Sequence, residues 1–152
     1  MTVEKGGRQI LIHGMSLILA GLVWGLLVPT TPYPRLALGA HIQFETNGML
    51  FMILGAVLLK LPHNVGSKSL RVMILAAWLT WGMALSEAAN AWWGTTGILP
   101  IAAAQAGATG GTSWQEAIMK VTHMGGALAL IAAWALLIVG FVRNGRSARS
   151  AD

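Results

Sequence analysis

The sequence predicts an all-α integral membrane protein, a four-helix bundle with both termini in the cytoplasm. Its composition, its apolar segments and the placement of its basic residues lead to this prediction. Of 152 residues, 55% are hydrophobic and only 10% are charged, whereas a soluble domain carries about 25% charged residues. The chain has no cysteine, which excludes disulfides and thiolate metal sites.

Four apolar segments are long enough to cross a bilayer, for which a helix needs about 20 residues. They run over about 10–28, 36–61, 70–93 and 114–142. We expect one membrane domain over residues 1–152. The first segment is expected to be retained, because Val28 to Pro32 offers no signal-peptide cleavage site. Gly21 and Gly25 have the G-x-x-x-G spacing that favours close helix contact. The connection 94–113 is predicted to form a partly buried re-entrant segment or a cap.

The basic residues indicate the orientation. Eight of the ten fall on one side of the predicted spans. These are Lys5, Arg8, Lys60, Lys68, Arg71, Arg143, Arg146 and Arg149. Only Arg35 and Lys120 remain for the other side or the membrane. Basic residues collect in cytoplasmic loops, so this distribution predicts cytoplasmic termini and reflects topology rather than nucleic-acid binding.

The second segment carries polar side chains at membrane depth, where each ionisable residue costs about 2.5–3.5 kcal/mol on insertion and usually has a function. His41 and Glu45 are four residues apart and share a helix face. Gln43 and Asn47 share a neighbouring face. In the first instance, His41 is either a ligand or a hydrogen-bonded packing residue. Glu45 either pairs with Arg35 or His41, or acts in catalysis.

Polar residues also mark the third and fourth segments. Glu87 and Asn90 share a face of the third segment, where they either join helices or take part in a site. Glu116 precedes Lys120 in the favourable i,i+4 order, which predicts a structural ion pair. The role of His123 stays open.

Aromatic residues and the remaining histidines have simpler interpretations. Trp92 and Trp93 belong either to an interfacial belt or to the wall of an aromatic pocket. His13 and His63 lie near or beyond the cytoplasmic boundary, so we expect surface positions for them.

The chain contains none of the common soluble-enzyme motifs, such as H-E-x-x-H, G-x-S-x-G or a phosphate-binding loop. Chemistry beyond acid–base catalysis therefore requires a bound cofactor. Imidazole is a standard axial ligand of haem iron.

Short motifs throughout the four segments resemble a known family. They are His13-Gly14, Pro34-Arg35, Ala40-His41, Asn47-Gly48, Ala89 to Gly94 and Leu99 to Ala104. This pattern is similar to that of the hydroxylaminobenzene mutases and the related styrene oxide isomerases. The last two motifs are more similar to the mutase branch.

The resemblance implies a small isomerase of the bacterial inner membrane, with four helices per subunit and a homotrimeric assembly. It also implies a haem b between adjacent subunits, with His41 as the axial ligand and Asn47 placing the substrate oxygen. One position departs from the isomerase pattern: Gly94 stands where the styrene oxide isomerases have a substrate-binding tyrosine, and the single tyrosine here is Tyr33. Epoxide opening in the isomerase manner is therefore in doubt.

The expected reaction is a redox-neutral rearrangement of a small aromatic substrate, from an aryl hydroxylamine to a 2-aminophenol. Ferric haem b held by His41 would act as a Lewis acid, and Arg35 is the candidate partner of its propionates. Asn47 and Asn90 would orient the substrate oxygen or nitrogen. Trp92 and Trp93 would stack near the aromatic ring of the substrate. Glu45 or Glu87 would shuttle a proton or offset the developing charge.

Three alternatives remain at this point. One is epoxide-to-aldehyde isomerisation of styrene oxide. The second is a haem-binding electron-transfer or anchor subunit, with His41 and His123 as two axial ligands. The third is a proton-coupled transporter using Glu45 and Glu87, which the lack of an internal repeat disfavours.

Overall fold

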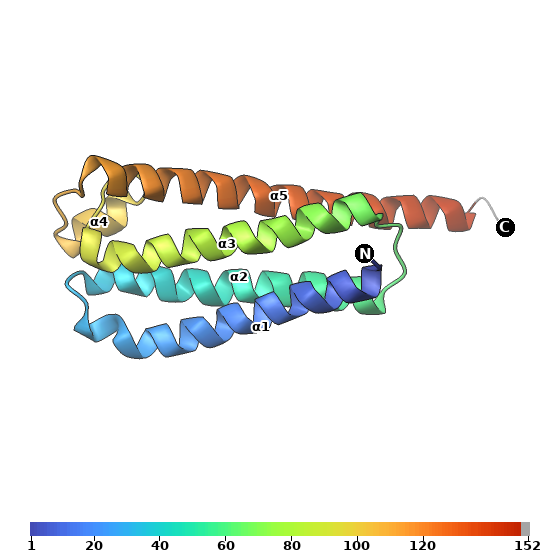
Figure 1. Cartoon of the computed structure of the whole chain (residues 1–152), viewed down its shortest axis with the longest axis horizontal. Helices are drawn as coiled ribbons and strands as arrows, with labels where there is room; N and C mark the ends of the chain where they lie inside the picture. Colours follow the sequence, from blue (N-terminus) through green and yellow to red (C-terminus); the bar gives the residue numbers. More distant parts are fainter. Residues whose placement is uncertain (150–152) are drawn as a thin grey trace.

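The structure is a computed structural model that describes the backbone of residues 1–149 and the side chains of residues 1–144 (Figure 1). Within that part of the chain every regular element is a helix. The elements are α1 (Val3–Leu27), the 3-10 helix η1 (Val28–Thr30), α2 (Pro34–Lys60), α3 (Ser67–Trp93), α4 (Pro100–Ala106) and α5 (Ser113–Arg149). The long helices α1, α2, α3 and α5 are each apolar enough to cross a membrane, which confirms the predicted four spans. The predicted basic tail lies partly outside the described residues.

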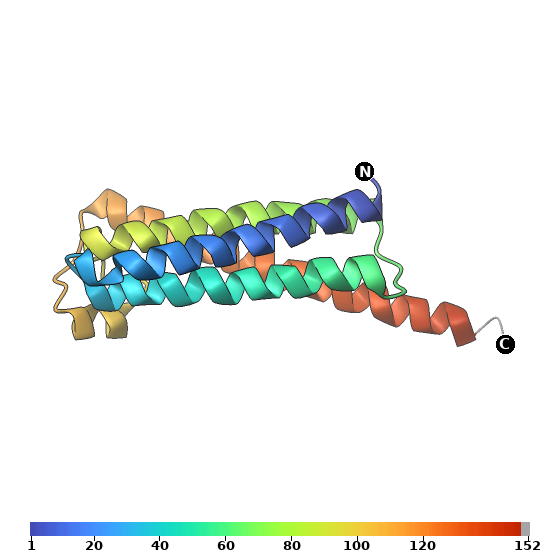
Figure 2. The same ribbon diagram turned by 90° about the horizontal axis from the view of Figure 1, so that it is seen from below.

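The long helices form two pairs. α1 packs mainly on α2, and α5 packs mainly on α3, while α2 and α3 join the pairs. The N-terminus and the end of α5 lie at the same end of the bundle, and α4 lies at the other end (Figures 1 and 2). α5 extends beyond the other helices at its C-terminal end.

Local signals in the sequence account for the helix ends. α1 begins at Val3, ahead of the apolar segment, because the Thr2 side chain accepts the N–H of Lys5 at 3.3 Å and caps the helix. α2 begins with Pro34, whose missing N–H is no loss at the first helical position. α3 ends at Trp93 and is followed by Gly94, where φ is +63°. Glycine adopts this left-handed conformation without steric cost.

The connection between α3 and α5 is a cap on the bundle end. Its helix α4 buries only Ala103 and leaves Ile101 exposed. Arg35, at the start of α2, donates from Nε to Gln105 Oε1 at 2.8 Å and so ties α4 to the bundle. Of the two forms predicted for this segment, the structure shows the cap.

Glycines bring α1 and α2 into backbone contact. A Cβ at Gly14 would lie 2.5 Å from Met52 N and 2.7 Å from Gly48 O. A Cβ at Gly55 would lie 2.9 Å from Gly7 O. Gly7 and Gly14 of α1 and Gly48 and Gly55 of α2 each lie seven residues apart, so they recur on the same helix face. We call this contact the glycine seam. It lets two apolar helices approach closely where lipid supplies no hydrophobic drive.

The contact between α2 and α3 fixes their antiparallel register. Tyr33 donates its N–H to Ala91 O at 3.1 Å. Further along, a Cβ at Gly39 would lie 2.8 Å from Glu87 Oε1. Residues of α2 before Gly39 therefore lie level with α3 residues that follow Glu87 by about the same number of positions.

The glycine seam predicts that Gly14→Ala destabilises the protein, by about 1–3 kcal/mol. The added methyl meets backbone atoms on α2, which cannot rotate away. Thermal unfolding in detergent measures the effect. Gly82→Ala is the matched control, because no atom lies within 4 Å of its added Cβ and alanine favours a helix over glycine. Equal stability of the two variants would contradict the seam.

Candidate functional site

His41 is held in one orientation by α1. Its Nδ1 lies 2.8 Å from Gly21 O. A carbonyl can only accept, so Nδ1 carries the proton and, in the neutral ring, Nε2 keeps a free lone pair. The ring lies over Gly25, where a Cβ would approach Cε1 to 3.0 Å. Gly21 and Gly25, predicted to make close helix contact, both lie against α2: a Cβ at Gly21 would lie 3.3 Å from Glu45 N, and Gly25 makes room for the His41 ring.

Glu45 lies beside His41 on the outer side of the bundle. Its Oε1 is 3.7 Å from His41 Nε2, too long for a hydrogen bond. The His41 and Glu45 side chains are 25% and 32% exposed. Large apolar side chains adjacent to them in α1 and α2 are also exposed: Leu22, Leu26, Leu38 and Ile42. His41 and Glu45, which we call the outer pair, therefore face out of the single chain.

Glu87 and His123 form a buried pair between α3 and α5. His123 Nε2 lies 3.3 Å from Glu87 Oε2, and the side chains are 11% and 5% exposed. His123 Nδ1 also lies 2.9 Å from Met119 O, so Nδ1 carries a proton. One more proton must then lie between Nε2 and Oε2. The sequence left His123 open, and no spacing rule joins it to Glu87 on another helix.

Two amide side chains of α2 have buried atoms without a hydrogen-bond partner. These atoms are Asn47 Nδ2 and Gln43 Oε1. Asn47 is only 6% exposed. Gly39, Gln43 and Asn47 follow one another at intervals of four residues, which places them in a row on one side of α2. Glu87 rests against the first of them.

Asn90 fixes the end of α3. Its Oδ1 accepts the N–H and the hydroxyl of Thr95, each at 2.8 Å, and its Nδ2 is buried without a partner. The antiparallel register places Asn90 level with Leu36, which precedes Asn47 by eleven positions. At 1.5 Å per residue, the two asparagines are about 16 Å apart along the bundle. The structure does not bring them together at one small substrate.

The two axial ligands of the electron-transfer alternative also do not meet. His41 is bound to α1, and His123 is bound to Glu87. Within the described residues, no three histidine, aspartate or glutamate side chains gather to hold a metal ion. The described chain therefore does not support bis-histidine ligation from within one subunit.

Trp92 and Trp93 lie against different neighbours. Trp92 packs edge-on to Trp24 of α1, with ring centroids 5.7 Å apart. Trp93 packs edge-on to Trp114 of α5 at 5.2 Å. They therefore do not wall one common pocket. Tyr33 lies against Gly94, where a Cβ would approach its Cε2 to 2.7 Å.

Glu116 does not pair with Lys120, so that prediction is wrong. Its carboxylate accepts backbone N–H groups from Thr96 at 2.8 Å, Gly97 at 3.0 Å and Gly111 at 3.4 Å. These bonds hold both ends of the α3–α5 connection. The backbone N–H groups that bind Glu116 belong to a loop, and a sequence pattern does not show where loop N–H groups lie. The spacing of Glu116 and Lys120 therefore predicted the wrong partner.

The expectation for His13 is also wrong. His13 is buried, accepts the indole N–H of Trp81 at 3.2 Å, and packs edge-on to Trp78. His63 is partly buried in the α2–α3 loop, where it contacts Leu58 O and accepts the N–H of Val65. Both histidines pack against neighbouring residues of the protein and do not lie on a free surface.

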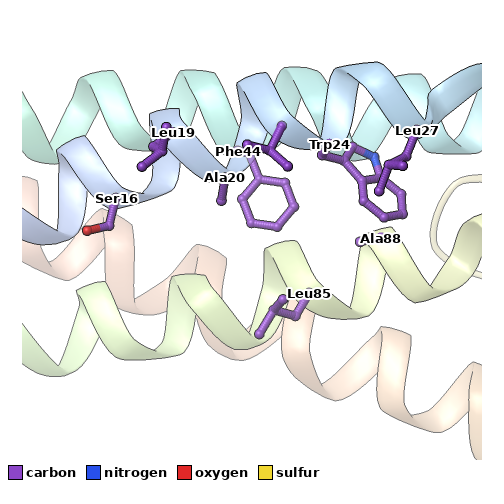
Figure 3. A pocket seen from close by; sticks show the side chains of 9 residues that line it. Ser16, Leu19, Ala20, Trp24, Leu27, Phe44, Leu85 and Ala88 are labelled. Atoms are coloured by element: carbon purple, nitrogen blue, oxygen red, sulfur yellow. The ribbon is translucent and has the colours of Figure 1, made fainter.

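Apolar grooves lie on the sides of the bundle. One, of about 400 Å³, runs between α1 and α3 and includes Phe44 of α2 (Figure 3). Trp24, at one end of it, donates its indole N–H to Ala37 O at 2.9 Å. None of the predicted site residues lines this groove. A second groove, of about 320 Å³, lies between α2 and α5 and is lined by Leu50, Leu130, Ile131 and Trp134.

Known proteins resemble this chain over most of its length. The family model for styrene oxide isomerase matches residues 7–142. Hydroxylaminobenzene mutase HabB of Ectopseudomonas oleovorans is 30% identical over 146 residues, covering 95% of this chain and 86% of the relative. Hydroxylaminobenzene mutase HabA of the same organism is 33% identical over 133 residues, covering 86% and 94%. No solved structure matches.

The Glu116 contacts predict that Glu116→Ala loosens the connection at residues 94–112, because three backbone N–H groups lose their acceptor. Limited proteolysis of the purified protein should show faster cleavage there. Lys120→Ala is the control and should cleave at the wild-type rate. Equal acceleration by both substitutions would instead support the ion pair.

Proposed function

Because the chain belongs to the styrene oxide isomerase family, we propose that it rearranges an aryl hydroxylamine, such as hydroxylaminobenzene, to a 2-aminophenol. The family and its relatives establish a membrane isomerase or mutase. Two relatives named as hydroxylaminobenzene mutases support this reaction. We place the protein in the bacterial inner membrane, and its basic residues support termini in the cytoplasm.

We further propose that His41 binds haem b through Nε2. The observation that supports this is the bond from Nδ1 to Gly21 O, which leaves the Nε2 lone pair for a metal. The exposed apolar side chains beside it suit a flat apolar group. When bound, ferric haem would supply a Lewis acid for the substrate oxygen. Arg35 remains the candidate for the propionates, because Gln105 occupies only its Nε.

The rearrangement is redox-neutral. The N–O bond breaks, a C–O bond forms at the ortho carbon, and the proton of that carbon passes to nitrogen. In this proposal Asn47 Nδ2 donates to the substrate oxygen, since it is buried without another acceptor. Asn90, by contrast, has a structural role, because its Oδ1 accepts the N–H of Thr95 in the turn that follows α3. The apolar bundle keeps water from the reactive intermediate.

Glu87 and His123 suit the proton transfer. They share one proton between Oε2 and Nε2, and both are buried. A proton can therefore enter or leave the pair, whereas an isolated buried charge would be costly. Glu45 is a second candidate, next to His41.

We also propose that the site is completed in a homotrimer, with the haem between subunits. His41 and Asn47 are six residues apart, which separates them by about 120° around α2. The outer pair faces out of its own chain, whereas Asn47 faces inward. A neighbouring subunit would enclose the exposed His41.

The proposed reaction is tested by giving membranes that contain the protein hydroxylaminobenzene and, separately, styrene oxide. We expect 2-aminophenol as the main product, identified by chromatography and mass spectrometry. The family description itself favours styrene oxide as the second candidate substrate. Conversion of the epoxide alone would reverse the preference, and conversion of neither would reject both reactions.

The cofactor proposal predicts a strong Soret absorbance in detergent-purified protein and its loss in His41→Ala, because His41 Nε2 is the atom that would hold the haem iron. His63→Ala is the control and should keep the band, since His63 serves the α2–α3 loop. A colourless wild-type protein that still turns over would contradict the cofactor assignment.

A further inference from the structure

Gln43 is a partly buried polar residue that the mechanism above does not use. Its Oε1 is buried and accepts no hydrogen bond. Four residues along α2, Asn47 Nδ2 is buried and donates none. Residues at this spacing lie about 6 Å apart and can bond to each other, yet these two do not. The interior thus presents one unused acceptor and one unused donor on successive turns.

Such atoms lower the stability of a membrane helix, because the bilayer core supplies no water to satisfy them. A residue retained only for packing would be better replaced by an apolar one. The Gln43 and Asn47 amides therefore indicate a ligand that donates a hydrogen bond to Gln43 Oε1 and accepts one from Asn47 Nδ2.

We propose that Gln43 is a substrate-positioning residue whose Oε1 accepts an N–H or O–H of the aryl hydroxylamine while Asn47 Nδ2 donates to its oxygen. This inference rests on the proposed function. An aryl hydroxylamine carries N–H and O–H donors together with acceptors, so it satisfies both amides. An epoxide oxygen only accepts, so it would leave Gln43 unsatisfied. Gln43 thereby selects the hydroxylamine over the epoxide.

The surroundings of Gln43 fit an aromatic molecule with a polar end. Leu50, two turns further along the same side of α2, lines the apolar groove of about 320 Å³ shared with α5. In the other direction, Glu87 lies against Gly39, one turn before Gln43. The row therefore runs from a proton-sharing pair, past two unsatisfied amides, to an apolar groove.

The test is Gln43→Met, which keeps the length of the side chain and removes the acceptor. We expect kcat/KM for hydroxylaminobenzene to fall about tenfold, with the unfolding temperature unchanged or raised. Affinity for styrene oxide, measured as a competing ligand, should stay within about twofold of wild type. Gln115→Met is the matched control. It removes an acceptor that is in use, by Thr112 N–H at 2.8 Å, and should keep wild-type kcat/KM.

A Gln43→Met protein with wild-type kcat/KM would overturn this proposal and leave the proposed function intact. A fall in kcat/KM that accompanies a lower unfolding temperature, or an equal loss of affinity for the epoxide, would show a packing role and overturn it as well. A wild-type protein that converts no hydroxylaminobenzene would overturn both proposals.

Discussion

The close approach of α1 and α2 along the glycine seam is the constraint on which the rest of the structure depends. Gly14 and Gly48 leave no room for a side chain between the two backbones. Because the helices lie this close, the carbonyl of Gly21 comes within 2.8 Å of His41 Nδ1. The same contact that joins the helices therefore sets the tautomer of the histidine and leaves its Nε2 free.

The polar residues of the chain divide into an outer and an inner group. The outer pair, His41 and Glu45, lies against α1 and is partly exposed on the outside of the bundle. The inner group consists of the Glu87–His123 pair between α3 and α5 and of Asn47, which is buried on α2. Their placement on different sides of α2 is the physical reason to expect that a second subunit completes the site.

The sequence predicts the four spans well, because long apolar segments and terminal proline and glycine residues determine them locally. It also predicts that His41 and Glu45 share a face, since helical periodicity alone fixes this. Relations between helices are less accessible. The Glu87–His123 pair depends on how α3 meets α5, and the burial of His13 depends on Trp81 of another helix.

The error at Glu116 concerns a group whose partners are backbone atoms. Glu116 binds loop N–H groups, whereas sequence spacing could offer it only a side-chain partner. The most direct test of the account is pulsed EPR of the ferric protein purified from cells grown on nitrogen-15-labelled histidine. The account predicts coupling of the iron to one histidine, lost in His41→Ala. Coupling to two histidines, or coupling that survives this substitution, would contradict it.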